Sequence, residues 1–386
     1  MAETAPESQD LAFTLAPLPV EGLAPAVQKL VGAPPAAKLM AAKGIAPLRP
    51  TELLVAIYQL SFDEDAAVKA AAETSAGALP DKVMLAPLGE SLPAAVLHFF
   101  AQRLAPTRTE CIARILYNQV TLDATFVRLA ERVFERETEI IVQNEARLLR
   151  CPSIVRALFM NKQARMSSVN RAIELCARNN VRVEGILGFD EIAKSIQEDP
   201  SAVDPAVADP GFASVLEKVA AISDEEVGDA EVTGSTEVTG ATKERSTRKS
   251  PIIDFTRLKL HEKIRLATLG NAYCRSNLIR DSNKMVSLAV IRSPLITDTE
   301  VVRYASNRQI GEDVIRYIAN QRDFTKMYQV KLNLAQNPKC PLGFSLRFLP
   351  MLHAEDLKAL AKSKNVPSAL AVAARKLVQT RSAKND

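Results

Sequence analysis

Residues 285–320 read MVSLAVIRSPLITDTEVVRYASNRQIGEDVIRYIAN, and they contain one pattern twice. The eight residues from Glu300 to Asn307 are echoed, thirteen residues further on, by those from Asp313 to Asn320. Each copy has an acid, two β-branched residues, Arg-Tyr, two small or apolar residues and a final Asn. This repetition predicts two short helices of the same build that stack on one another, which is the unit of an α-solenoid.

The ends of these two helices also carry signals. Thr297 and Glu300 have the spacing of a capping box, in which each side chain binds a free backbone N–H at the helix start. Asn307 and Asn320 are predicted to stop their helices in the left-handed conformation, since Asn tolerates a positive φ better than most residues. Two more capping boxes are predicted at residues 61–64 and 107–110.

Working outward, the whole chain has the composition of packed helices. Its 386 residues contain no Trp and 14 Gly, and sustained alternation of polar and apolar residues is largely missing. We therefore predict an all-α protein, an α-solenoid of short helical repeats in two segments joined by a disordered acidic linker.

The predicted boundaries follow proline and charge. Residues 1–48 are rich in Pro and Ala and are predicted to be a disordered tail, because Pro interrupts helices. Residues 49–197 are predicted to form an N-terminal helical-repeat domain, and residues 251–386 a basic C-terminal one. Residues 198–250 are expected to be an acidic flexible linker, because a polar segment cannot bury enough apolar surface to offset the entropy of ordering.

Charge is unevenly distributed around that linker. Residues 198–242 contain eleven acids and one Lys, a net charge of −10. Residues 243–386 contain 27 Lys and Arg against twelve acids, a net charge of +15, although the chain as a whole carries only +4. A basic segment of this kind favours an anionic partner.

Proline-containing turns recur between the predicted C-terminal helices, at Ser293-Pro294, Asn337-Pro338 and Val366-Pro367. Together with the Asn-terminated helices, they resemble the HEAT/armadillo-like class of helical repeats and the leucine-rich-variant repeats. The resemblance is one of pattern and covers roughly residues 110–180 and 258–380. It implies an interaction scaffold with a curved groove, and it implies no particular ligand.

Signals for catalysis are weak. His98, His261 and His353 lie apart without metal-ligand spacing, and His98 stands in an apolar run that predicts a core position. The five cysteines lack a C-x-x-C motif and are expected to be buried thiols in a reducing compartment. No nucleotide-binding or nucleophile-elbow motif is present. We therefore expect a protein that is not an enzyme and that has no cofactor and no metal site.

The candidate partner-binding residues lie in the basic segment. Arg303 and Arg316 hold equivalent places in the two echoed helices, and stacking is expected to align them one repeat apart. The full set is Arg275, Arg280, Arg292, Arg303, Tyr304, Arg308, Arg316, Tyr317, Arg322 and Lys326. Such cations beside aromatic rings fit a nucleic-acid backbone. They also fit an acidic protein surface, or simply a solvated outer face whose tyrosines lie in the core.

From these observations the expected function is that of a scaffold or adaptor. It would bind a protein partner through a helical-repeat groove, with the C-terminal segment as the charged recognition surface. Nucleic-acid binding by residues 251–386 is the alternative. A cytoplasmic location is expected, because the acidic start of the chain lacks the features of a secretory signal and no apolar run approaches about 20 residues.

Overall fold

The computed structural model describes residues 13–222, 254–363 and 365–382. These residues form helices joined by short turns, and no β-strand occurs among them. The chain divides into two compact units, Met1–Asp209 and Pro210–Asp386, called here the N-terminal and C-terminal units. The prediction of an all-α protein with two segments of short helices is confirmed.

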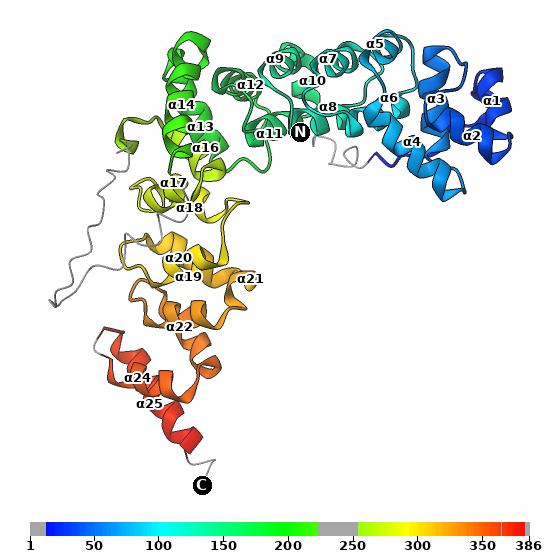
Figure 1. Cartoon of the computed structure of the whole chain (residues 1–386). Coiled ribbons are helices and arrows are strands. Elements are labelled where there is room, and N and C mark those ends of the chain that lie inside the picture. The colour runs from blue at the N-terminus through cyan, green and yellow to red at the C-terminus, as the bar shows by residue number, and fades with distance from the viewer. Residues whose placement is uncertain (1–12, 223–253, 364, 383–386) are drawn as a thin grey trace, which may run out of the picture. The chain divides into compact units, whose positions relative to one another are not determined.

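The helices of the N-terminal unit stack in two rows, and Figure 1 shows them in blue to green. The first row consists of α3 (Pro50–Leu60), α5 (Asp81–Gly89), α7 (Thr109–Tyr117), α9 (Glu135–Gln143) and α12 (Met166–Arg178), each packed on the next. The second row consists of α2 (Pro35–Ala42), α4 (Ala66–Ala78), α6 (Ala94–Arg103), α8 (Asp123–Ala130) and α11 (Ser153–Met160). The other elements of this unit are η2 (Val20–Gly22), α1 (Pro25–Val31), α10 (Glu145–Arg150), α13 (Phe189–Gln197) and η3 (Pro200–Val203). Helix α14 (Pro205–Ala220) contains the division between the units.

The C-terminal unit follows the same principle. Helix α18 (Lys284–Ile291) packs between α16 (Leu260–Leu269) and α20 (Glu312–Asn320), while α19 (Asp298–Ser306) packs on α22 (Tyr328–Gln336). The remaining elements are η4 (Phe255–Arg257), α17 (Ala272–Leu278), α21 (Arg322–Thr325), α23 (Leu342–Phe348), η5 (Leu349–Met351), α24 (Ala354–Lys362) and α25 (Ser368–Ser382).

Each helix buries one apolar stripe. In α20, for example, Val314, Ile315 and Ile318 are all fully buried, and their spacing places them on one face of the helix. A helix of nine residues is too short to be stable alone in water, so this stripe must be covered by neighbouring repeats. The two predicted short helices, α19 and α20, are confirmed; they contact each other, but each packs mainly on another helix, α22 and α18.

Asparagine side chains at helix ends join successive repeats. The Asn161 carboxamide Nδ2 donates to the carbonyl oxygens of Ala130 (2.9 Å) and Val133 (2.8 Å), which lie in and just after α8. Its Oδ1 accepts the N–H of Gln163 at 2.9 Å. Asn118, after α7, and Asn337, after α22, make the same set of bonds to the repeats before them. These bonds satisfy carbonyls that the ends of short helices leave without a partner.

This arrangement corrects the prediction of left-handed stops. Asn307 has φ −77° and ψ 121°, which is extended backbone, and Asn320 is the last residue of α20 rather than a cap. Among the described residues other than glycine, the positive φ belongs to Asn180. The chain must leave Asn307 in an extended direction to reach the next helix, and the Asn307 Oδ1 holds the turn by accepting the N–H of Gln309 at 2.8 Å.

Two of the three predicted capping boxes are wrong. Helix α4 begins after Asp65, whose Oδ1 accepts the Ala67 N–H at 2.8 Å, whereas Ser61 closes α3. Helix α7 begins after Arg108 instead of Thr107. The box of Thr297 and Glu300 is confirmed, with the Thr297 N–H donating to Glu300 Oε2 at 2.9 Å.

The predicted tail also needs correction. Within residues 1–48, α1 and α2 are packed helices, and Val27, Ala41 and Ala42 are fully buried. Pro25 and Pro35 are the first residues of these helices, a position where the missing N–H of Pro costs nothing. Pro25 and Pro35 therefore mark the starts of helices, and the prediction that Pro interrupts the helices of this segment is wrong.

The predicted linker of residues 198–250 is likewise too long. Its first part forms η3 and α14, and it buries Ala202, Phe212 and Val219. These apolar side chains give the segment a surface to pack with. The acidic stretch of residues 223–253, with its expected flexibility, lies outside the described residues.

We expect Asn161→Ala to lower the free energy of unfolding by about 1–3 kcal/mol, because two buried carbonyls lose their donor. Urea unfolding of the full chain, followed by circular dichroism, measures this change. The matched control is Asn179→Ala, since the exposed Asn179 Nδ2 donates to the Leu175 carbonyl of the helix that it follows, at 2.9 Å, and joins no second repeat through this bond. That change should stay within about 0.5 kcal/mol. Equal losses in the two variants would contradict a role of Asn161 between repeats.

Candidate functional site

The structure disperses the ten basic and aromatic residues predicted to bind a partner. Arg303 lies on α19 and Arg316 on α20, and these helices pack mainly on different neighbours, α22 and α18. The expected alignment of Arg303 with Arg316 along one row is therefore wrong. The individual residues fall into three groups by their surroundings.

Arg275 belongs to the interior of the C-terminal unit. Its side chain is 4% exposed, and its guanidinium grips the Glu300 carboxylate through Nε (2.9 Å) and Nη2 (3.0 Å). The third nitrogen, Nη1, donates to the Gly270 carbonyl at 2.7 Å. Burial acts to raise the pKa of Glu300, but the bonds from Arg275 and Thr297 outweigh it and hold that pKa below its ordinary value. Arg275 therefore cannot present its charge to a partner.

The tyrosines are packed beneath arginines. Tyr304 is 2% exposed, and burial raises its pKa, so it is a core residue that lies next to the Glu300 carboxylate. The guanidinium of Arg303 lies 5.7 Å from the centre of the Tyr304 ring. Arg292 lies 4.8 Å from the centre of the half-buried Tyr317 ring. These are cation–π contacts within the unit.

The remaining cations lie on the surface, and some of them are already paired. Arg316 bonds Glu312 at 2.6 Å and Lys326 bonds Asp323 at 2.6 Å, each within its own helix or turn. The side chains of Arg280, Arg292, Arg308 and Arg322 are exposed. The sequence correctly placed positive charge on this unit, but local acids neutralise part of it.

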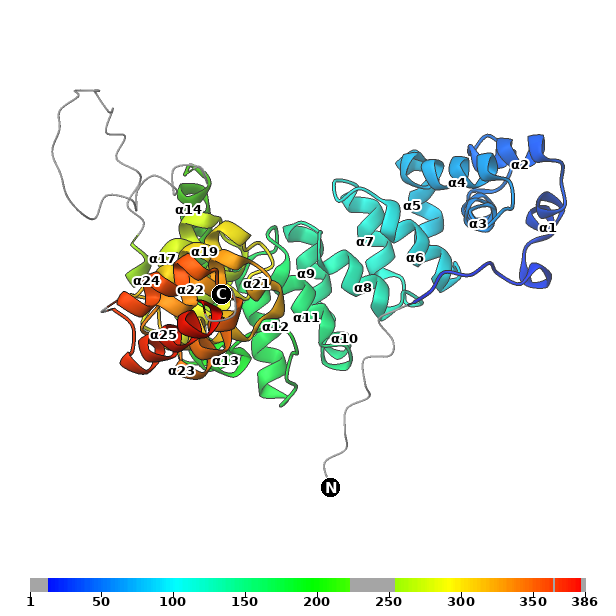
Figure 2. The ribbon, with the colours of Figure 1, turned by 90° about the horizontal axis from the view of Figure 1, so that it is seen from below.

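A different surface of the protein already holds a stretch of peptide. Residues 13–19 form no helix, and Figure 2 shows this dark blue stretch running past α6 toward α8. We call residues 13–18 the N-terminal segment. The Gln59 carboxamide makes two hydrogen bonds to the main chain of this segment. Its Oε1 accepts the Leu18 N–H at 3.0 Å, and its Nε2 donates to the Leu18 carbonyl at 3.2 Å. The Tyr58 hydroxyl donates to the Ala16 carbonyl at 2.5 Å.

The far end of the N-terminal segment rests on a histidine. The Phe13 ring meets the His98 ring edge-on, with their centres 5.3 Å apart. His98 is 4% exposed, and its two nitrogens lie 2.8 Å from Thr125 Oγ1 and from Gln102 Nε2. Burial, together with the charge of Arg128, lowers the pKa of His98, so the ring is neutral at pH 7. Its predicted core position is confirmed.

An open cavity of about 410 Å³ continues from Phe13 along the second row. We call it the second-row groove. Its lining residues come from Phe13, α6, α8 and α11, and from Glu131 directly after α8: Phe13, His98, Gln102, Ala124, Val127, Arg128, Glu131, Ser153, Arg156, Ala157 and Met160. The lining thus combines apolar side chains with positively and negatively charged groups. The groove can hold a chain with small or apolar side chains and can pair its polar groups.

Sequence reasoning missed this site. Gln59 and Leu18 are 41 residues apart, and neither belongs to a motif. No signal in the sequence connects them, because the contact exists only once α3 has been placed in its row.

In the described part of the chain, no group of three or more His, Cys, Asp or Glu residues could hold a metal ion. Among those same residues, no helix has both the length and the apolar character needed to cross a membrane. The five cysteines are thiols, and burial raises the pKa of Cys111 and of Cys176 to about 11.

Comparison of this chain with protein-family models, with curated proteins and with solved structures finds no match.

Replacing Arg275 by Met should lower the free energy of unfolding at pH 7 by about 3–5 kcal/mol, because it leaves the Glu300 charge buried without its partner. The double variant Arg275→Met/Glu300→Leu should recover most of this loss. Chemical denaturation of the three proteins measures both effects, and a single variant as stable as the parent would contradict the structural role.

The same pair sets a pH dependence. A carboxyl whose folded pKa is depressed stabilises the fold above its ordinary pKa of 4.5, and this contribution is lost as the pH falls through the folded value. The parent protein should therefore lose stability below about pH 4.5 more steeply than the double variant does.

Proposed function

We propose that this protein is a non-catalytic scaffold or adaptor that holds an extended segment of a protein partner in the second-row groove. The observation that carries the proposal is the N-terminal segment itself. Contacts from Gln59 and Tyr58 to its main chain do not depend on side-chain identity, which is how extended peptides are bound in general. The open groove continues beyond Phe13, and its polar lining residues, such as Gln102, Arg128 and Glu131, can hydrogen-bond the main chain of a second chain.

Rigid support favours such a role. The groove is built on helices that are fixed by bonds between repeats, such as those of Asn161, so the surface exists before the partner arrives. Preformed sites bind more tightly because less ordering accompanies binding. A kinship with HEAT/armadillo-like or leucine-rich-variant repeats fits this proposal, supported by the paired rows and by Asn bonds that span 28–32 residues.

A direct test uses a labelled peptide with the sequence of residues 13–18. It is titrated against the full chain in which these six residues are replaced by Gly and Ser, so that the peptide's own site is open. We expect saturable binding by fluorescence anisotropy, with little dependence on salt. Gln59→Ala should weaken it about tenfold, because two hydrogen bonds to the peptide main chain are lost.

The matched control is Gln197→Ala, an exposed glutamine on α13 that should leave the affinity unchanged. Absence of binding, or equal binding by the Gln59 variant, would contradict a site that reads the peptide main chain. A partner that uses the groove should in turn compete with the labelled peptide when its site extends over Phe13.

Nucleic-acid binding by the C-terminal unit is the alternative proposal, supported by the exposed Arg292, Arg308 and Arg322. Three phosphate contacts to a single strand would give a slope of about −2 for log K against log salt. Replacing all three by Ser should abolish that slope. A salt-independent affinity, or a slope that the triple variant retains, would contradict phosphate binding by these residues.

A further inference from the structure

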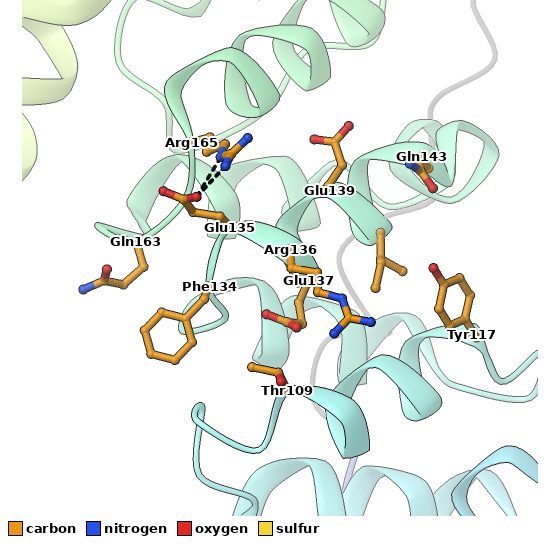
Figure 3. A pocket seen from close by; sticks show the side chains of 11 residues that line it. Thr109, Tyr117, Phe134, Glu135, Arg136, Glu137, Glu139, Gln143, Gln163 and Arg165 are labelled. Carbon is orange, nitrogen blue, oxygen red and sulfur yellow. Dashed lines mark hydrogen bonds and ion pairs between the residues drawn. The ribbon is translucent and has the colours of Figure 1, made fainter. Parts of the chain in front are cut away.

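The first row of the N-terminal unit carries a second cavity, separate from the second-row groove. It has a volume of about 650 Å³ and lies between α7, α9 and the turn before α12. Figure 3 shows its lining side chains. These are Thr109, Tyr117, Phe134, Glu135, Arg136, Glu137, Glu139, Ile140, Gln143, Gln163 and Arg165. We call it the first-row cavity.

Three of the four carboxylates in and beside this cavity have partners. Glu135 pairs with Arg165 at 2.7 Å, and Glu110, at the edge, pairs with Arg136 at 2.5 Å. Glu139 accepts hydrogen bonds from Arg171 and from Ser168. The carboxylate of Glu137 is different.

Glu137 is fully buried, and no side chain donates a hydrogen bond to either of its carboxylate oxygens. Figure 3 shows this carboxylate between the Phe134 ring and the Arg136 side chain, close to Thr109. Burial raises its pKa, although nearby backbone N–H groups and the charge of Arg136 act in the opposite direction. A buried, ionised carboxylate without a cationic partner costs more free energy than a neutral amide or an apolar residue in the same place.

The C-terminal unit contains a carboxylate in the same position that has a cationic partner. Glu137 is the third residue of α9, and Glu300 is the third residue of α19. Both are buried. Glu300 receives a guanidinium from the neighbouring helix, with the two bonds of Arg275 at 2.9 and 3.0 Å. In the N-terminal unit, the first-row cavity lies where Glu137 could receive such a group.

We propose that the first-row cavity binds an arginine side chain of a partner protein, with its guanidinium on the Glu137 carboxylate. The planar fork of a guanidinium fits a carboxylate through two parallel hydrogen bonds. Phe134 and Ile140 line the route for the alkyl part of the side chain, and Tyr117, which is 66% exposed, offers an aromatic face at the rim.

Arg136 must give way for this ligand. Its ion pair with Glu110 is exposed, with 62% and 55% of the two side chains accessible, and pairs of that kind contribute little to stability. An incoming guanidinium therefore displaces a weakly held side chain and gains a buried carboxylate. This site stands on its own residues and does not depend on peptide binding in the second-row groove.

The test uses N-acetyl-arginine methylamide as the probe and its neutral citrulline analogue as the control ligand. Titration into the full-length protein, followed by NMR or calorimetry, should show saturable binding of the arginine compound in the millimolar range. The citrulline analogue should bind at least tenfold more weakly. Comparable binding of the two compounds, or no binding of the arginine compound at 50 mM, a concentration well above the expected range, would overturn the proposal.

Glu137→Gln should abolish binding while leaving the protein folded and at least as stable at pH 7, because an unpartnered charge is removed. Glu184→Gln, at an exposed carboxylate away from the cavity, should bind like the parent. Arg136→Ala should strengthen binding about threefold, because it removes the competing cation. Retained binding in Glu137→Gln, or weaker binding in Arg136→Ala, would show that the guanidinium does not rest on Glu137.

Discussion

Short helices leave many backbone carbonyls without a partner, and the structure depends on how these carbonyls are satisfied. A helix of nine residues leaves its last four carbonyls open, so open ends are a large share of each repeat. The side chains of Asn118, Asn161 and Asn337 donate hydrogen bonds to such backbone carbonyls of the repeat before them. The same carboxamide holds the following turn through its oxygen. One side chain thus ends a helix, shapes the turn and joins two repeats.

These bonds between repeats explain why the surface of the protein is well defined. Rows of helices fixed to their neighbours present grooves whose shape does not wait for a ligand. Gln59 and Tyr58, on α3, bond the backbone of the N-terminal segment, and Phe13 at its far end lines the second-row groove, so the surface can hold an extended chain by its backbone. The second-row groove and the first-row cavity lie on different rows, so one partner could bind at two separate sites.

Buried charge distinguishes the two units. Glu300 forms an ion pair with Arg275 of the same chain, and this pair stabilises the fold. Glu137 has the equivalent place in its helix but receives no hydrogen bond from a side chain, and it lies at a cavity. The physical contrast between these two residues carries more functional information than the overall charge of either unit.

The sequence alone determined the fold class, the two short helices at residues 298–320 and the capping box of Thr297, because these depend on local periodicity and on residues within one turn of each other. It could not separate Pro25 and Pro35 as helix starts from Pro as an interruption, and it could not show whether Asn307 acts through its backbone or its side chain. Tertiary structure decided that Arg275 is buried, that Gln59 meets Leu18 and that Glu137 faces a cavity. These facts depend on residues about 25 or more positions apart, which only the stacking of the helices brings together.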